Sequence, residues 1–167
     1  MFYSRLQVGN KQLFLSTFES RLKDVLKQQW RENVGLKHKL RTYFQFKNLL
    51  EPEKYLYLNC NRQAIRALSC LRLSTLPLEI EKGRRNDIPP TERFCKICNT
   101  NMVEDEYHFV LICPLYNFLR IQYLPSDVFL DPNHYKFIKL MRSSDSIVLH
   151  KLCNFVYQAM KLREKTC

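Results

Sequence analysis

The sequence predicts a mostly α-helical protein: an irregular multi-helix domain with an embedded CCHC (Cys-Cys-His-Cys) module. Only three of the 167 residues are glycine, which leaves little material for the tight turns of an all-β fold. Apolar residues recur at three- and four-residue steps along much of the chain, the period of amphipathic helices. Hydrophobic residues make up 46% of the sequence, so the chain can bury a core.

Four helices are predicted in the N-terminal portion, residues 1–90, each with apolar residues at helical spacing. They span residues 11–33, about 37–49, a stretch that begins after Asn61, and 76–82. Asn10 and Asn61 can cap helix starts with side-chain oxygens, and Gly35 and Gly83 can end the first and fourth helices. The prolines at 89 and 90 mark the best candidate boundary in the chain.

Three further helices are predicted after Cys113. They span residues 115–123, about 131–141 and 144–164, and prolines near the first two starts have the fixed φ that suits a first turn. Residues 125–167 are expected to pack on the same body as the N-terminal portion.

A sharp chemical signal lies in residues 91–124. Cys95 and Cys98 are separated by two residues, nine residues precede His108, and four more precede Cys113. A tight turn between two such cysteines points both sulfurs at one ion and lets backbone N–H groups satisfy the sulfur charge. Three sulfurs and one nitrogen suit a tetrahedral Zn²⁺ site with no open position for water. We therefore predict a structural zinc site.

The five-residue step from His108 to Cys113 needs its own explanation. Residues 103–113 are predicted to form a helix with an acidic first turn, and five positions along an ideal helix fall about half a turn out of alignment. Pro114 pushes the residue before it out of the α region. We therefore expect Cys113 to leave the helix axis and turn back toward the metal.

An alternative interpretation is that His108 and Cys113 are core residues and that Cys95 and Cys98 are free thiols. The presence of both motifs together favours the metal. The remaining cysteines and histidines match no ligand spacing: Cys60, Cys70, Cys153, Cys167, His38, His134 and His150.

The net charge of +11, from 27 Lys and Arg against 16 Asp and Glu, attracts polyanions such as RNA and DNA. No secretory signal and no apolar stretch of the roughly 20 residues needed to span a bilayer are visible. We expect a soluble intracellular protein, nuclear or cytoplasmic, with no membrane contact and no small-molecule substrate. In a reducing compartment, clustered cysteines favour a metal site over disulfides.

Four stretches resemble a known family: Leu78-Glu-Ile-Glu-Lys-Gly-Arg84, Ile88-Pro-Pro-Thr-Glu-Arg-Phe-Cys-Lys-Ile-Cys98, Val103-Glu-Asp-Glu-Tyr-His-Phe109 and Cys113-Pro-Leu-Tyr-Asn-Phe-Leu-Arg120. They resemble the C-terminal zinc-binding region of reverse transcriptases from non-LTR (LINE-type) retrotransposons. That region lies downstream of the polymerase and helps hold template RNA or target DNA. The resemblance covers about residues 39–124 and implies the same metal ligands, Cys95, Cys98, His108 and Cys113.

Candidate phosphate contacts come from charge and position. Four lie near the cysteine cluster in sequence and two share an outer face of the third predicted helix: Arg84, Arg85, Arg93 and Lys96, then Arg62 and Arg66. The expected partners are RNA or DNA and, from the resemblance, a reverse transcriptase core.

No catalytic centre is predicted. There is no Asp-Asp pair in a strand-turn-strand setting, and the chain is too short for a polymerase palm. Asp127, Asp131 and Asp145 lack the compact acidic and Lys cluster that a nuclease needs. We expect a non-catalytic region, or a detached remnant, of an RNA-directed DNA polymerase. The alternative is an intracellular protein-interaction module in which zinc only staples two helices together.

Overall fold

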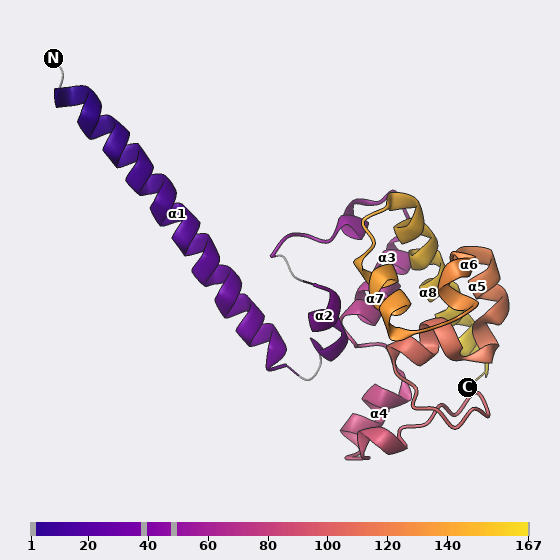
Figure 1. The fold of residues 1–167 in the computed structure, drawn as a ribbon. Helices are drawn as coiled ribbons and strands as arrows, with labels where there is room; N and C mark the ends of the chain where they lie inside the picture. The colour runs from indigo at the N-terminus through magenta and orange to yellow at the C-terminus, as the bar shows by residue number, and fades with distance from the viewer. Residues whose placement is uncertain (1–2, 38–39, 48–49, 167) are drawn as a thin grey trace.

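The computed structural model describes residues 3–37, 40–47 and 50–166, with side chains described from residue 11 onward, and it is mostly helical, as predicted (Figure 1). The helices are α1 (Tyr3–Gly35), α2 (Arg41–Phe46), α3 (Arg62–Arg72), α4 (Glu79–Arg85), α5 (Asn117–Tyr123), α6 (Ser126–Phe129), α7 (His134–Arg142) and α8 (Ser146–Thr166). Tight 3₁₀ turns lie at Lys54–Tyr57, Pro90–Glu92 and Pro114–Tyr116, and a π-helical turn at His108–Ile112. None of these helices is long and apolar enough to cross a membrane.

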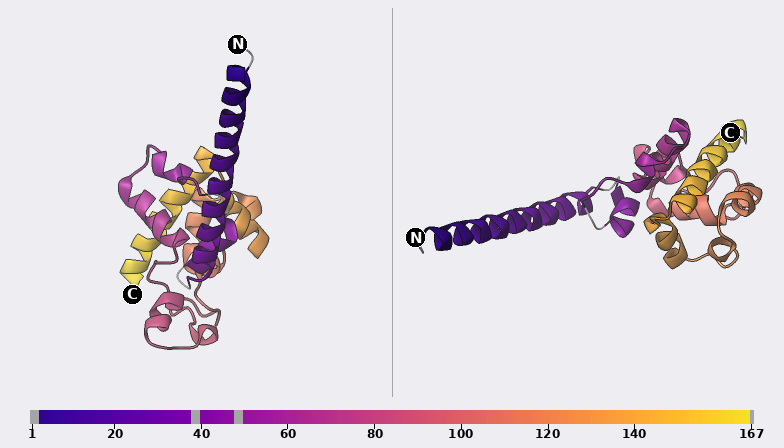
Figure 2. Two further views of the ribbon diagram at one scale, coloured as in Figure 1. Left: turned by 90° about the vertical axis from the view of Figure 1, so that its left-hand side faces the viewer. Right: turned by 90° about the horizontal axis from the view of Figure 1, so that it is seen from above.

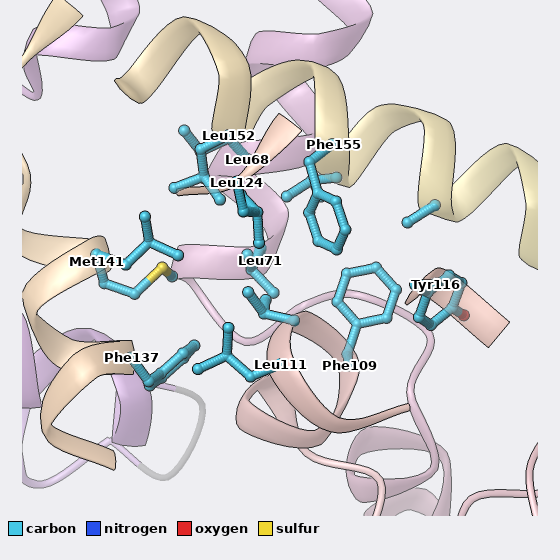
Figure 3. Packing of buried hydrophobic residues seen from close by; sticks show 14 of the residues in the cluster. Leu68, Leu71, Phe109, Leu111, Tyr116, Leu124, Phe137, Met141, Leu152 and Phe155 are labelled. Atoms are coloured by element: carbon cyan, nitrogen blue, oxygen red, sulfur yellow. The ribbon is translucent and has the colours of Figure 1, made fainter. Parts of the chain in front are cut away.

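Helices α2–α8 form a body, and α1 projects from it, as the views in Figure 2 show. The core lies where α3 packs on α8, with Leu68 and Leu71 facing Leu152 and Phe155 (Figure 3). The ring of Phe109 joins them, 6.3 Å from the ring of Phe155 between centroids. The buried cluster therefore draws residues from all three predicted segments, 1–90, 91–124 and 125–167.

Helix boundaries agree best where a local side chain caps the helix. Asn61 Oδ1 accepts a hydrogen bond from Gln63 N at 2.8 Å, so α3 begins where predicted. Helix α8 lies within two residues of its predicted bounds, because Asp145 Oδ1 accepts from the first turn. Helix α7 starts later than predicted, since Asn133 caps it and Asp131 does not. The short α6 was not predicted.

The first two helices differ from the prediction in opposite ways. Helix α1 is longer, and Asn10 lies inside it and so does not cap its start. Helix α2 is shorter, and neither Lys37 nor Lys47 is helical. Leu40, which precedes it, provides no side-chain cap. Part of the predicted span 37–49, including His38, falls outside the described residues, as does Cys167.

Helix α4 starts at Glu79, not at residue 76, and continues through Gly83 to Arg85. Its start is stabilised from elsewhere in the chain: Glu104 Oε2 accepts a hydrogen bond from Glu79 N at 2.8 Å. Gly83 does not end the helix but lies beneath Arg93, where an added Cβ would be 2.6 Å from Arg93 Cγ. The prediction failed here because both controlling contacts are tertiary.

Candidate metal centre

The four predicted ligands converge. The sulfurs of Cys95, Cys98 and Cys113 and a ring nitrogen of His108 all lie within 4.8 Å of one another, a cluster that could hold a metal ion. Cys98 Sγ is 3.3 Å from His108 Nε2. Cys98 is half-buried and the other three are buried. In the described part of the chain, no other group of three or more Cys, His, Asp or Glu residues is placed to do the same.

A short paired loop positions the first two sulfurs. Phe94 and Val103 form an antiparallel bridge, and Cys95 N donates to Met102 O at 2.9 Å beside it. The loop between these residues carries Cys98 back over the cluster. Because Val103 is paired in this way, the helix predicted from residue 103 begins only at Glu106.

A π-helical turn then brings His108 and Cys113 together. Residues 108–112 form the turn, and Cys113 N donates to His108 O, five residues earlier, at 2.8 Å. A π-helical turn holds more residues than an α-helical turn, so each residue rotates less about the helix axis. A step of five residues therefore returns close to the same face. Cys113 itself leaves the helix with φ −54° and ψ 119°, as Pro114 predicted, but the π turn was missed.

Arg120 fixes the turn that carries Cys113. Its buried guanidinium donates to the carbonyl oxygens of Cys113 and Val110 and to Asn117 Oδ1. All three acceptors are neutral. Burial lowers the pKa of Arg120 to about 10, so the side chain remains a cation at neutral pH, buried next to the cluster.

A second buried arginine ties the cluster to α8. Arg163 donates two hydrogen bonds to the carboxylate of Glu104, and Glu104 Oε1 lies 3.4 Å from Cys95 Sγ. Because Glu104 also accepts from Glu79 N, one carboxylate joins α4, the Cys95 loop and the end of α8. The loop that carries Cys95 and Cys98 is therefore tied to the core.

Burial is the largest single influence on the pKa of each ligand. It raises the pKa of the Cys95 thiol, and it raises the pKa of Cys113 to about 11. Burial also acts to raise the pKa of Cys98, but hydrogen bonds, those with Thr100 foremost, outweigh it and lower that pKa. Burial lowers the pKa of His108, which favours the neutral imidazole that binds metals. A metal must therefore displace thiol protons when it binds.

The imidazole of His108 has one polar neighbourhood. Nε2 faces the sulfurs, while Nδ1 is buried and has no hydrogen-bond partner among the residues that the structure describes. Asp105 Oδ1 accepts from the backbone N of His108 at 2.8 Å. The hydrogen bond to Asp105 holds the backbone of His108 in place. Among the described residues, the sulfur cluster is the polar group that the imidazole ring contacts.

The six predicted phosphate contacts are divided by the fold. Arg84 pairs with Glu81 and Lys96 with Glu79. Arg93 donates to two backbone carbonyls, those of Ile88 and Ile80, each at 2.8 Å, so it positions the chain around Gly83. The remaining three are exposed, as Lys96 also is, and they lie on α3 and α4 (Figure 1): Arg62, Arg66 and Arg85.

Sequence reasoning missed three residues around the cluster: Glu104, Arg120 and Arg163. Their importance comes from burial beside the ligands, which residue spacing does not reveal. Glu104 and Arg120 do fall within stretches that carry the family resemblance.

Comparison with known proteins adds no relative. No family model matches the chain, and no curated protein and no solved structure is significantly similar to it.

Proposed function

We propose that this chain is a non-catalytic, zinc-binding and nucleic-acid-binding region, corresponding to the C-terminal region, or a remnant of it, of a non-LTR retrotransposon reverse transcriptase. The observation that carries the proposal is the convergence of Cys95, Cys98, His108 and Cys113 within 4.8 Å. The resemblance of the surrounding stretches supplies the family.

Zinc fits the donor set and the charges around it. Three thiolates, a neutral imidazole and Zn²⁺ form a closed tetrahedral set with a net charge of about −1. Glu104 is neutralised by Arg163, which leaves the buried charge of Arg120 to balance the centre. When bound, zinc supplies a structural cross-link between the Cys95 loop and the π turn.

Metal analysis of the purified chain tests the zinc site. We expect one zinc ion per chain in the wild type and in Cys70→Ser, which removes a half-buried cysteine outside the cluster. Cys95→Ser should lose most of its zinc, since a hydroxyl is a poor zinc ligand. A wild-type chain without zinc, or a Cys95→Ser chain that retains it, would contradict the proposal.

Nucleic-acid binding is supported by the net charge of +11 and the exposed arginines of α3 and α4. Affinity for RNA or DNA should fall steeply between about 50 and 200 mM salt. Arg62→Glu with Arg66→Glu should weaken binding strongly. The control, Lys139→Glu with Lys151→Glu, changes the net charge equally at exposed sites on α7 and α8 and should weaken it less. Equal losses would show attraction by charge alone.

The alternative function is protein interaction with a structural metal. The apolar side chains that α1 leaves exposed favour it. An intact metal cluster without affinity for RNA or DNA at low salt would support this alternative and reject nucleic-acid binding.

A further inference from the structure

Helix α1 carries an apolar stripe that the body leaves uncovered. Six large apolar side chains on it are 45–69% exposed: Phe14, Leu15, Phe18, Leu22, Val25 and Leu26. Figure 1 and the right-hand view of Figure 2 show this part of α1 extending away from the body. Its far end does dock, since Val34 is buried and the ring of Trp30 lies edge-on to Tyr43 at 6.5 Å.

The spacing of the stripe is that of a helix pair. Leu15, Phe18, Leu22 and Val25 follow alternating steps of three and four residues, which is the seam of a left-handed coiled coil. Ser20, Lys23, Asp24 and Lys27 lie off this seam, while Lys11 continues it at its N-terminal end. The stripe therefore suits another helix with a matching apolar seam, and between Phe14 and Leu26 it offers no charge to a phosphate backbone.

We propose that the stripe of α1 is a dimer interface, occupied by the α1 stripe of a second copy of this chain in parallel orientation. Each chain offers six side chains of about 100 Å² exposed area, so two stripes bury roughly 1,200 Å², at the lower end of the ~1,200–2,000 Å² of stable interfaces. A second copy supplies the same seam in register without any other partner.

The flanking charges select the parallel orientation. In a parallel pair, the positions beside the seam set Phe14 opposite Glu19 and Arg21 opposite Leu26 of the other copy, so no like charges meet at these flanking positions. The two Lys11 side chains face each other only at the end of the seam, beyond the apolar stripe. In an antiparallel pair matched about Ser20, Glu19 faces Glu19 and Arg21 faces Arg21. Like charges at facing positions destabilise such pairs.

Measurement of mass in solution tests the dimer. Light scattering and sedimentation of the full wild-type chain, from about 1 to about 100 μM, should show a monomer–dimer equilibrium. Leu22→Glu should weaken the dimer by about 100-fold or more, because it buries an unpaired charge in the seam. Ser20→Glu adds the same charge on the opposite face of α1 and should leave the dimer intact.

The outcomes are distinct from those of the zinc and nucleic-acid proposals. The experiment uses nuclease-treated protein in about 0.5 M salt, where two basic chains are not bridged by nucleic acid. Unchanged metal content in both variants shows that the body is folded. A monomer at every concentration, or a dimer that Leu22→Glu leaves unchanged, overturns the proposal.

Discussion

Helices α1 and α8 are the two longest helices described. Both carry an apolar face, but the face of α8 is buried and that of α1 is exposed. Helix α8 buries Leu149, Leu152, Phe155 and Val156 against its neighbours α3 and α5. Helix α1 leaves a stripe of comparable size open and touches α2 near its last turns. Periodicity therefore predicts that a helix has an apolar face, while the partner of that face depends on the rest of the chain.

The largest contrast is expected from one truncation on each helix. Phe155→Ala should lower the free energy of unfolding by about 3–5 kcal/mol, because it leaves a cavity between α8 and Phe109. Phe18→Ala, on the exposed part of α1, should change it by less than about 0.5 kcal/mol. Urea unfolding measures both in a Leu22→Glu background, where α1 is unpaired. Similar losses at the two sites would erase the contrast.

Charge removal should separate the two helices in the same way. Arg163→Met on α8 leaves Glu104 buried without its cation, at a cost of about 3 kcal/mol. Lys27→Met on α1 removes an exposed pair with Asp24, worth less than about 0.5 kcal/mol. Chemical denaturation compares the two variants with the wild type.

A second change in Glu104 checks the cause of that loss. Glu104→Gln added to Arg163→Met removes the unpaired charge, so it should recover part of the stability. No recovery would show that packing, and not charge, accounts for the role of Arg163.

Substitution of Gly83 and of Gly35 by alanine should change the free energy of unfolding with opposite signs. Gly83→Ala forces Arg93 from its place, because the new Cβ would lie 2.6 Å from Arg93 Cγ, and should cost about 1–2 kcal/mol. At Gly35 the nearest atom, Phe44 Cε2, is 3.5 Å away. Gly35→Ala should therefore gain about 0.5 kcal/mol from helix propensity. Thermal unfolding of both variants tests the signs, and destabilisation by both would refute the comparison.

The last prediction is a pH dependence that originates on α8. Burial raises the pKa of Cys153 from 9.0 to about 12, so the folded chain holds this proton more tightly than the unfolded chain. Its stabilising contribution is complete below about pH 9 and is lost as pH rises toward 12. In metal-loaded protein, unfolding measured at pH 7, 9 and 10.5 should show less alkaline loss in Cys153→Ala than in the wild type. Cys70→Ala, the thiol-removal control, should follow the wild type.

Much of the candidate site was predictable from spacing. The spacing of Cys95 and Cys98 and the position of Cys113 before a proline are local patterns. The structure brings the side chains of these three cysteines together with His108. The π turn at residues 108–112 was not predictable, because the polar residues around it act through tertiary contacts. Arg120 reaches back seven residues to the carbonyl of Cys113, and Glu104 and Arg163 meet across 59 residues of sequence.

The sequence alone determined the helical character, the positions of α3 and α8, and the four residues that converge as candidate metal ligands. These features depend on propensity, side-chain caps and short spacing, which act between residues a few positions apart. The tertiary structure decided where α4 starts, which arginines are buried beside the cluster, and that the stripe of α1 stays uncovered. Those outcomes depend on which groups share the limited buried volume, and that is settled only when distant segments pack together.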